Sequence, residues 1–159
     1  MKPPTFTIVI PHYHDTAGLS ALLSSLARER ATDEAHSLQV IVVDDCSTLC
    51  RDLLFDLGQR FDWMELMVLE KRSGPARCRN LGASSARADW IWFLDSDVEL
   101  EPNALLAMQQ VIATHPTVAG FLCGVGVRPY SRQSSQRYKN FIEHSWHPPE
   151  GLTTVVDSK

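Results

Sequence analysis

Short runs of apolar, β-branched residues alternate with helical patterns from about residue 5 to residue 125 of this chain. Runs of this kind predict buried strands, here over Phe6–Ile10, Gln39–Val43, Glu65–Leu69, Trp90–Leu94 and Val118–Cys123. The helical patterns begin at Asp15 or Thr16, with Leu19, Leu22, Leu23 and Leu26 on one face, and continue over Asp52–Phe61, Pro75–Ala86 and Pro102–Thr114. Apolar strands that alternate with helices are typical of an α/β fold, a mostly parallel sheet flanked by helices on both faces.

Two local details follow from the same patterns. Pro11 is expected to end the first strand and to open a loop that runs to Asp15. In the helix over 52–61, Leu53, Leu54 and Leu57 are expected to face the core. The polar segment after Gly126 gives weaker signals, a short helix over 138–146 and a strand over 152–156.

Composition narrows the classes of protein to consider. A length of 159 residues with 44% hydrophobic and 21% charged residues suits one globular domain. A net charge of -4 and a pI near 5.8 argue against a nucleic-acid binder. No apolar run approaches the ~20 residues of a membrane span, and the N-terminus lacks a signal-peptide core. The cysteines at 46, 50, 78 and 123 form no C-x-x-C pair, so reduced thiols and a cytoplasmic location are expected.

Acidic and other polar residues follow three of the predicted strands. The segment His12–Asp15 follows the first strand, Asp44 and Asp45 the second, and Asp95-Ser96-Asp97 the fourth. Ligands of parallel α/β sheets bind beyond the carboxyl ends of the strands. We therefore expect these three groups at one edge of the sheet, around one binding site.

Asp95 and Asp97 are the candidate metal ligands. Two carboxylates two residues apart repel each other, and a divalent cation removes that cost. Mg²⁺ and Mn²⁺ take oxygen ligands, and commonly combine one or two carboxylates with phosphate oxygens of a substrate. The alternative is a turn in which the aspartates cap backbone amides.

A basic cluster precedes and opens the third predicted helix. Lys71, Arg72, Arg77 and Arg79 lie within nine residues, around the turn Ser73-Gly74-Pro75. Helix N-termini attract anions, so the cluster suits a diphosphate, or carboxylates that frame one. The alternative is a solvated basic helix face.

The remaining candidates have two interpretations each. Asp44 and Asp45 suit hydrogen bonds to a nucleotide base or ribose, or caps of the turn through Ser47. His12 and His14 suit ligand contacts or local hydrogen bonds. His144 and His147 have the helical spacing of a metal pair, but Pro148 and Pro149 follow them directly.

Taken in order, four segments resemble the family 2 glycosyltransferases, whose catalytic domain has the GT-A fold. The matching stretches are Ile8–Tyr13, Val42–Ser47, Gly74–Ala83 and Trp92–Val98, within a core of about residues 5–125. The resemblance implies one nucleotide-sugar-binding domain over 1–159, with 126–159 a partial acceptor-side segment.

The resemblance also implies roles for single residues. Pro11 and Tyr13 would line the pocket of the donor base, Asp45 would receive the base, and Asp44 would support that loop. Arg79 and Asn80 match the family's Arg-Asn pair, near the base and the aspartate motif. Asp95 would hold the ribose or a metal-bound water, and Asp97 would ligate Mn²⁺ or Mg²⁺ on the donor diphosphate. The donor would be a nucleotide-diphosphate sugar, most commonly a UDP-sugar.

The family's catalytic base, an Asp often preceded by Glu, has no match before Lys159. We therefore expect a C-terminally truncated fragment that binds the donor but transfers little sugar. The parent would transfer the sugar with inversion to an acceptor hydroxyl, and this role is compatible with an association with the cytoplasmic face of a membrane.

Two other functions are compatible with the sequence. Ile91–Val98 also matches the first motif of haloacid-dehalogenase-like phosphatases, in which the first Asp is a nucleophile. That motif normally lies near the N-terminus. A non-catalytic nucleotide-binding module is the other alternative.

Overall fold

The computed structural model describes residues 6–32, 38–115 and no others. Residues up to Val111 belong to one compact unit, and the second unit begins at Ile112, of which only residues 112–115 are described. The strand predicted over 118–123, the helix over 138–146, the strand over 152–156 and the histidines at 144 and 147 lie outside the described residues.

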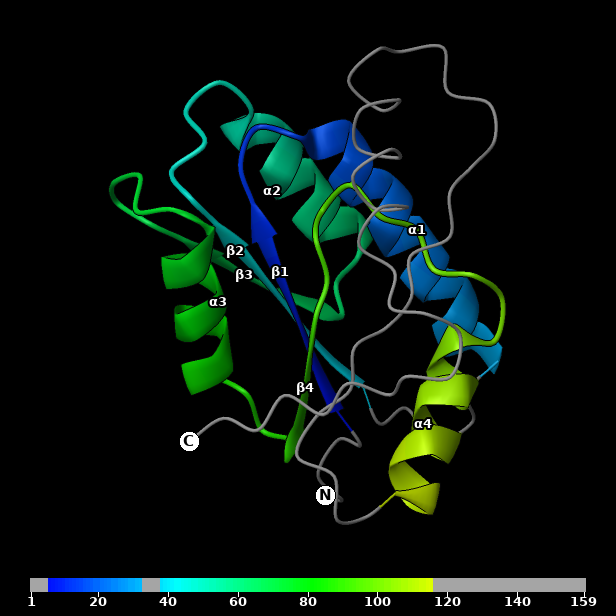
Figure 1. The fold of residues 1–159 in the computed structure, drawn as a ribbon. Helices are drawn as coiled ribbons and strands as arrows, with labels where there is room; N and C mark the ends of the chain where they lie inside the picture. The colour runs from blue at the N-terminus through cyan, green and yellow to red at the C-terminus, as the bar shows by residue number, and fades with distance from the viewer. Residues whose placement is uncertain (1–5, 33–37, 116–159) are drawn as a thin grey trace, which may run out of the picture. The chain divides into compact units, whose positions relative to one another are not determined.

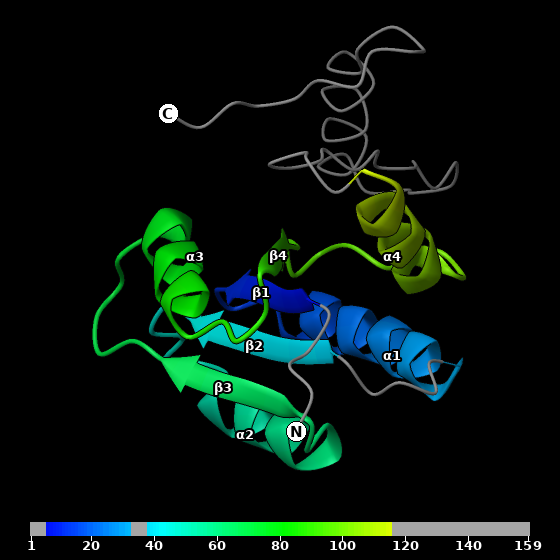
Figure 2. The same ribbon diagram turned by 90° about the horizontal axis from the view of Figure 1, so that it is seen from below.

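Four parallel strands form the sheet, in the order β3-β2-β1-β4. The strands are β1 (Phe6–His12), β2 (Leu38–Asp44), β3 (Met64–Val68) and β4 (Trp90–Phe93). The helices are α1 (Thr16–Thr32), α2 (Arg51–Arg60), α3 (Pro75–Ser84) and α4 (Ala104–Thr114). Helices α1 and α2 cover one face of the sheet and α3 the other, as Figures 1 and 2 show. The predicted α/β class with a parallel sheet is confirmed.

The two faces of the sheet have separate cores. On one face, Val9 packs against Gly82 of α3, and Ile41 and Val43 cluster with Cys78. Alternation along the strands turns Ile8, Ile10, Val40 and Val42 to the other face, toward the fully buried leucines of α1. Those leucines are the four that the helical spacing predicted: Leu19, Leu22, Leu23 and Leu26.

The prediction that Pro11 ends the first strand is wrong. Strand β1 continues through His12, with Pro11 in register with Val43. The carbonyl of Val9 accepts from Leu94 next to β4, so the nitrogen of Pro11 also points toward that side. Pairing between β1 and β4 ends at Val9 and Phe93, so the missing N–H of proline costs no ladder hydrogen bond there.

Leu53 is also a correction, because 54% of it is exposed whereas Leu54 and Leu57 are buried. At about 100° per residue, Leu53 and Leu54 lie on opposite sides of Leu57, about 40° and about 60° away from it. Only the side of α2 that carries Leu54 is buried.

Candidate functional site

The topology places three loops side by side. Strands β2, β1 and β4 are neighbours, and parallel strands have their carboxyl ends at the same edge. The loops after His12, Asp44 and Phe93 therefore meet at one edge, as the sequence predicted. From β1 the chain adds β2 and β3 on one side of the sheet, and β4 then pairs with the other side of β1. In α/β sheets, ligands bind at such a change of side.

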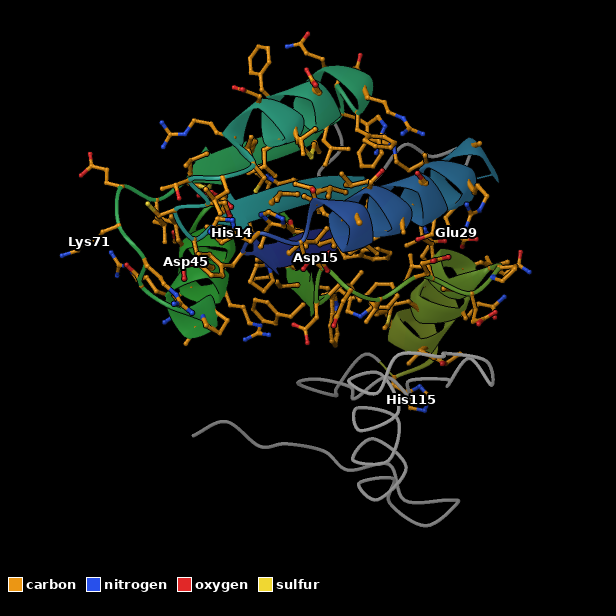
Figure 3. All side chains as sticks on the ribbon, turned by 90° about the horizontal axis from the view of Figure 1, so that it is seen from above. His14, Asp15, Glu29, Asp45, Lys71 and His115 are labelled. Atoms are coloured by element: carbon orange, nitrogen blue, oxygen red, sulfur yellow. The ribbon has the colours of Figure 1, made fainter. Side chains whose placement is uncertain are left out.

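The loop after β1 is held by local hydrogen bonds. The backbone of His14 is in the left-handed region (φ 58°) and its N–H donates to Ser47 Oγ at 2.9 Å. The ring of His14 lies beside the thiol of Cys50, with Nδ1 and Sγ 3.8 Å apart. Asp15 caps α1, accepting from the N–H of Gly18 at 2.9 Å. Figure 3 shows His14, Asp15 and Asp45 at this edge.

Asp44 is a structural residue of the second loop. Its fully buried carboxylate bonds to His12 Nδ1 at 2.8 Å and accepts from the N–H of Ser47 at 2.8 Å and from the Ser47 hydroxyl. Within the described residues, Nε2 of His12 is the one buried side-chain polar atom without a hydrogen-bond partner. Asp44 thus supports the turn at Ser47, and its role beside a donor stays a prediction. Both His12 and His14 make local hydrogen bonds, which was one of their two interpretations.

Asp45 joins the second loop to the start of α3. The residue is 4% exposed, and its carboxylate accepts from the N–H groups of Ser73 (2.6 Å) and Gly74 (2.9 Å). Gly74 is the N-cap of α3, at a φ of 88° that glycine adopts without strain, and Pro75 follows at the first helical position. The anion at these two amides is thus a carboxylate of the protein itself.

The first acid after β4 is held by α3. Asp95 Oδ1 accepts from Arg79 Nη2 at 2.6 Å, and 60% of the Asp95 side chain and 34% of the Arg79 side chain are exposed. Leu94 donates to the carbonyl of Val9, which fixes this acid beside the end of β1. In the basic cluster, Arg79 therefore pairs with a carboxylate of the protein.

The other predicted site residues differ in burial. Asp97 and Asn80 are exposed, and Pro11 is half-buried. Tyr13 is 40% exposed. The loop that holds Asp97 packs on α1, because a Cβ built at Gly18 would lie 2.8 Å from the carbonyl oxygen of Ser96.

One contact at this edge was not predicted. The Arg72 guanidinium lies over the ring of Tyr13, 4.3 Å from the ring centroid. The sequence marked Arg72 only as a member of the basic cluster. The signal that pairs it with Tyr13 is three-dimensional, because 58 other residues separate the two in the chain.

The two acids of the second loop also act on a neighbouring thiol. Burial, together with the negative charges of Asp45 and Asp44, raises the pKa of Cys78 from 9.0 to about 11, and the charge of Arg79 opposes this rise. Cys78 is fully buried in α3. It is therefore a neutral packing residue at ordinary pH, and Cys46, Cys50 and Cys78 are all free thiols.

The described part of the chain contains no group of three or more His, Cys, Asp or Glu residues arranged to hold a metal ion. Among the same residues, no helix is both long enough and apolar enough to cross a membrane.

Comparison with known proteins agrees with this arrangement. The sequence model of glycosyl transferase family 2 matches residues 7–156. The chain belongs to glycosyl transferase family 2. A glycosyltransferase of Haemophilus influenzae is 31% identical over 112 residues, which are 70% of this chain and 36% of that protein. The succinoglycan biosynthesis protein ExoO of Rhizobium meliloti is 34% identical over 108 residues, 67% of this chain and 29% of that protein.

Solved structures give the same fold. The 1–349 fragment of Staphylococcus aureus TarS in complex with UDP-GlcNAc superposes with a TM-score of 0.65 and 26% identity, covering 80% of this chain and 37% of that one. TarS is a poly(ribitol-phosphate) β-N-acetylglucosaminyltransferase. The chain thus spans well under half the length of these relatives. The GT-A fold of this family 2 glycosyltransferase domain is shown by these similarities.

Proposed function

We propose that this chain binds the nucleotide-sugar donor of an inverting glycosyltransferase, with a UDP-sugar as the donor. The observation that carries the proposal is the shared attachment to α3. Asp45 bonds to the two amides at the start of the helix, and Asp95 pairs with Arg79 one turn further on. One helix thereby holds the two acidic loops in a fixed relation at the edge where such sheets bind ligands.

We assign each site residue at this edge of the sheet a role in donor binding. Tyr13 and Pro11 line the base pocket beside the loop that holds Asp45. Asp44 supports that loop through its hydrogen bond with Ser47. Asn80 accompanies Arg79 near the aspartates, and Asp95 binds the ribose or a metal-bound water. The complex of the similar TarS fragment with UDP-GlcNAc supports a uridine nucleotide.

Asp97, with Asp95, would hold Mn²⁺ or Mg²⁺. The donor set fits such an ion, because both ligands are exposed carboxylates. The described residues offer no closed cage of three or more ligands, as expected where substrate phosphates and water complete the shell. When bound, the ion supplies Lewis-acid stabilisation of the leaving diphosphate.

The protein's own part in the reaction is to fix the donor. An acceptor hydroxyl attacks the anomeric carbon from the face opposite the nucleotide, and loses its proton to a carboxylate base. The new carbon–oxygen bond replaces the bond to the diphosphate, which leaves as the nucleoside diphosphate. We assign the base to none of the described residues, and the haloacid-dehalogenase interpretation receives no support from the family match.

A titration of the chain with nucleotides tests the donor assignment. With Mn²⁺ present, isothermal calorimetry is expected to show that UDP binds at least tenfold more tightly than ADP. UDP-GlcNAc and UDP are expected to compete for one site. A folded protein that binds no nucleoside diphosphate, or that binds ADP as tightly as UDP, contradicts the proposal.

A further inference from the structure

Arg72 and Tyr13 form a stacked pair at the edge of the proposed base pocket. The guanidinium carbon lies 4.3 Å from the centroid of the Tyr13 ring, within the range of a cation–π interaction. The His14 ring contacts the same tyrosine in an edge-to-face arrangement, with a centroid distance of 4.3 Å and an interplanar angle of 68°. Tyr13 is nevertheless 40% exposed, so part of it remains available to a ligand.

The backbone around Arg72 is fixed on both sides by the second loop. On one side, Ser73 and Gly74 donate to the Asp45 carboxylate. On the other side, the carbonyl of Glu70 accepts from the thiol of Cys46, with a sulfur–oxygen distance of 3.4 Å. The stacked pair therefore joins the loops after β1, β2 and β3 into one unit next to Asp45.

Arg72 and Arg79 occupy different ends of this edge. Arg79 pairs with Asp95 in the loop after β4, whereas Arg72 adjoins Asp45 and packs on an aromatic ring. A guanidinium that uses its face for stacking keeps its N–H groups along its edge, and these donate to oxygen acceptors. Next to a base pocket, the matching acceptors are the carbonyl oxygens of a pyrimidine.

We propose that Arg72 is a specificity-determining residue of the donor site, which holds the Tyr13 ring as a wall of the base pocket and favours a base rich in carbonyl oxygens. The proposal rests on the proposed function, since it assigns a role within that nucleotide site. It places the effect of Arg72 on the nucleoside and not on the diphosphate.

The test compares the wild-type chain with Arg72→Ala and Lys71→Ala. Lys71 is the matched control because it lies in the same loop and carries the same charge, and Figure 3 shows its side chain directed away from the domain. Binding of uridine, UDP and CDP is measured by ligand-detected NMR with Mg²⁺ present. Urea unfolding of each variant checks that it is folded.

Arg72→Ala is expected to weaken the binding of uridine and of UDP by the same factor, roughly two- to fivefold. It is also expected to reduce the preference for UDP over CDP. In a Tyr13→Leu background, the same substitution is expected to have a much smaller effect, because the ring through which Arg72 acts is gone. Lys71→Ala is expected to leave uridine binding unchanged.

Three results would overturn the role of Arg72 alone. One is a loss for UDP without a loss for uridine, which would assign Arg72 to the diphosphate. The others are an equal loss in Lys71→Ala, and tighter binding in Arg72→Ala, which would make the guanidinium a competitor of the base. Failure of the folded wild-type chain to bind uridine or UDP refutes the proposed function itself. The wild-type titration alone shows that failure, so it is distinguished from a failure of the role of Arg72.

Discussion

The Arg79 guanidinium and the Asp95 carboxylate join α3 to the loop that follows β4, with Nη2 2.6 Å from Oδ1. Asp45 bonds to the amides at the start of the same helix. Helix α3 therefore fixes two acidic loops at once, and it is itself fixed on β1 by the close contact of Gly82 with Val9.

Removing the Arg79 side chain is expected to weaken UDP binding and to leave the protein folded. An exposed ion pair contributes at most about 1 kcal/mol to folding, so Arg79→Ala should change the free energy of unfolding by no more than that. The affinity for UDP is expected to fall by roughly fivefold, because Asp95 loses the partner that orients it.

Arg87→Ala is the matched control for Arg79→Ala. Arg87 makes a similar exposed pair with Glu65, at 2.7 Å, beside the opposite end of β3 and β4. It should leave UDP affinity unchanged. Equal affinity losses in both variants, measured by calorimetry, would show that Arg79 acts only through overall charge.

Asp45→Asn is expected to destabilise the fold and to impair nucleotide binding. The asparagine amide presents an N–H group where the carboxylate accepts from Ser73 or Gly74. An unsatisfied buried donor costs about 1–3 kcal/mol. Urea unfolding should show a loss of this size, whereas Asp56→Asn on the exposed face of α2 should stay within about 0.5 kcal/mol of wild type. Matching midpoints for the two variants would refute the capping role of Asp45.

Two helix glycines are expected to respond oppositely to alanine. A Cβ at Gly82 would collide with the buried side chain of Val9, so Gly82→Ala should cost about 1–3 kcal/mol through overpacking. A Cβ at Gly58 of α2 would meet only the methyl group of Met64, at 3.8 Å. Gly58→Ala should therefore stabilise the protein by about 0.5–1 kcal/mol. Thermal or urea unfolding measures both, and a stabilised Gly82→Ala would show that α3 does not need this close approach.

Cys78 is expected to make stability fall at high pH. Below pH 9 its thiol is neutral in the folded and unfolded chains, so it has no effect. Between the unfolded value of 9.0 and the folded value of about 11, the unfolded chain releases a proton that the folded chain retains. The free energy of unfolding should then drop by roughly 2–3 kcal/mol across this range.

Comparison with Cys78→Ala isolates this effect from the other groups that titrate above pH 9. The stability difference between wild type and Cys78→Ala should be constant below pH 9 and should shift against wild type above it. A difference that stays constant from pH 8 to pH 11 would show that Cys78 ionises normally in the folded protein.

Much of the fold was predictable because apolar periodicity reports burial directly. The leucines at 19, 22, 23 and 26 all proved fully buried, and the strand-end positions of Asp44 and Asp95 placed both at one edge. The structure adds the strand order, in which β1 lies between β2 and β4.

The details that failed depend on neighbours that the sequence does not name. Pro11 remains in its strand because β4 has already ended beside it. Leu53 and Leu54 lie on opposite sides of Leu57 on α2, and helical spacing alone does not tell which of the two sides is buried. The amides that donate to Asp45 belong to residues 28 and 29 positions further along the chain. Local capping patterns carry no information at that separation.

The dependence of UDP binding on a divalent cation tests the site most directly. Calorimetry with Mn²⁺ or with EDTA is applied to the wild-type chain, to Asp97→Ala, and to Asp89→Ala, which removes an exposed acid at the opposite end of β4. We expect Mn²⁺ to tighten UDP binding at least tenfold in the wild type and in Asp89→Ala, and to have little effect in Asp97→Ala. Equal gains from Mn²⁺ in all three proteins would contradict the role of Asp97 as the ligand of a cation that bridges to the diphosphate.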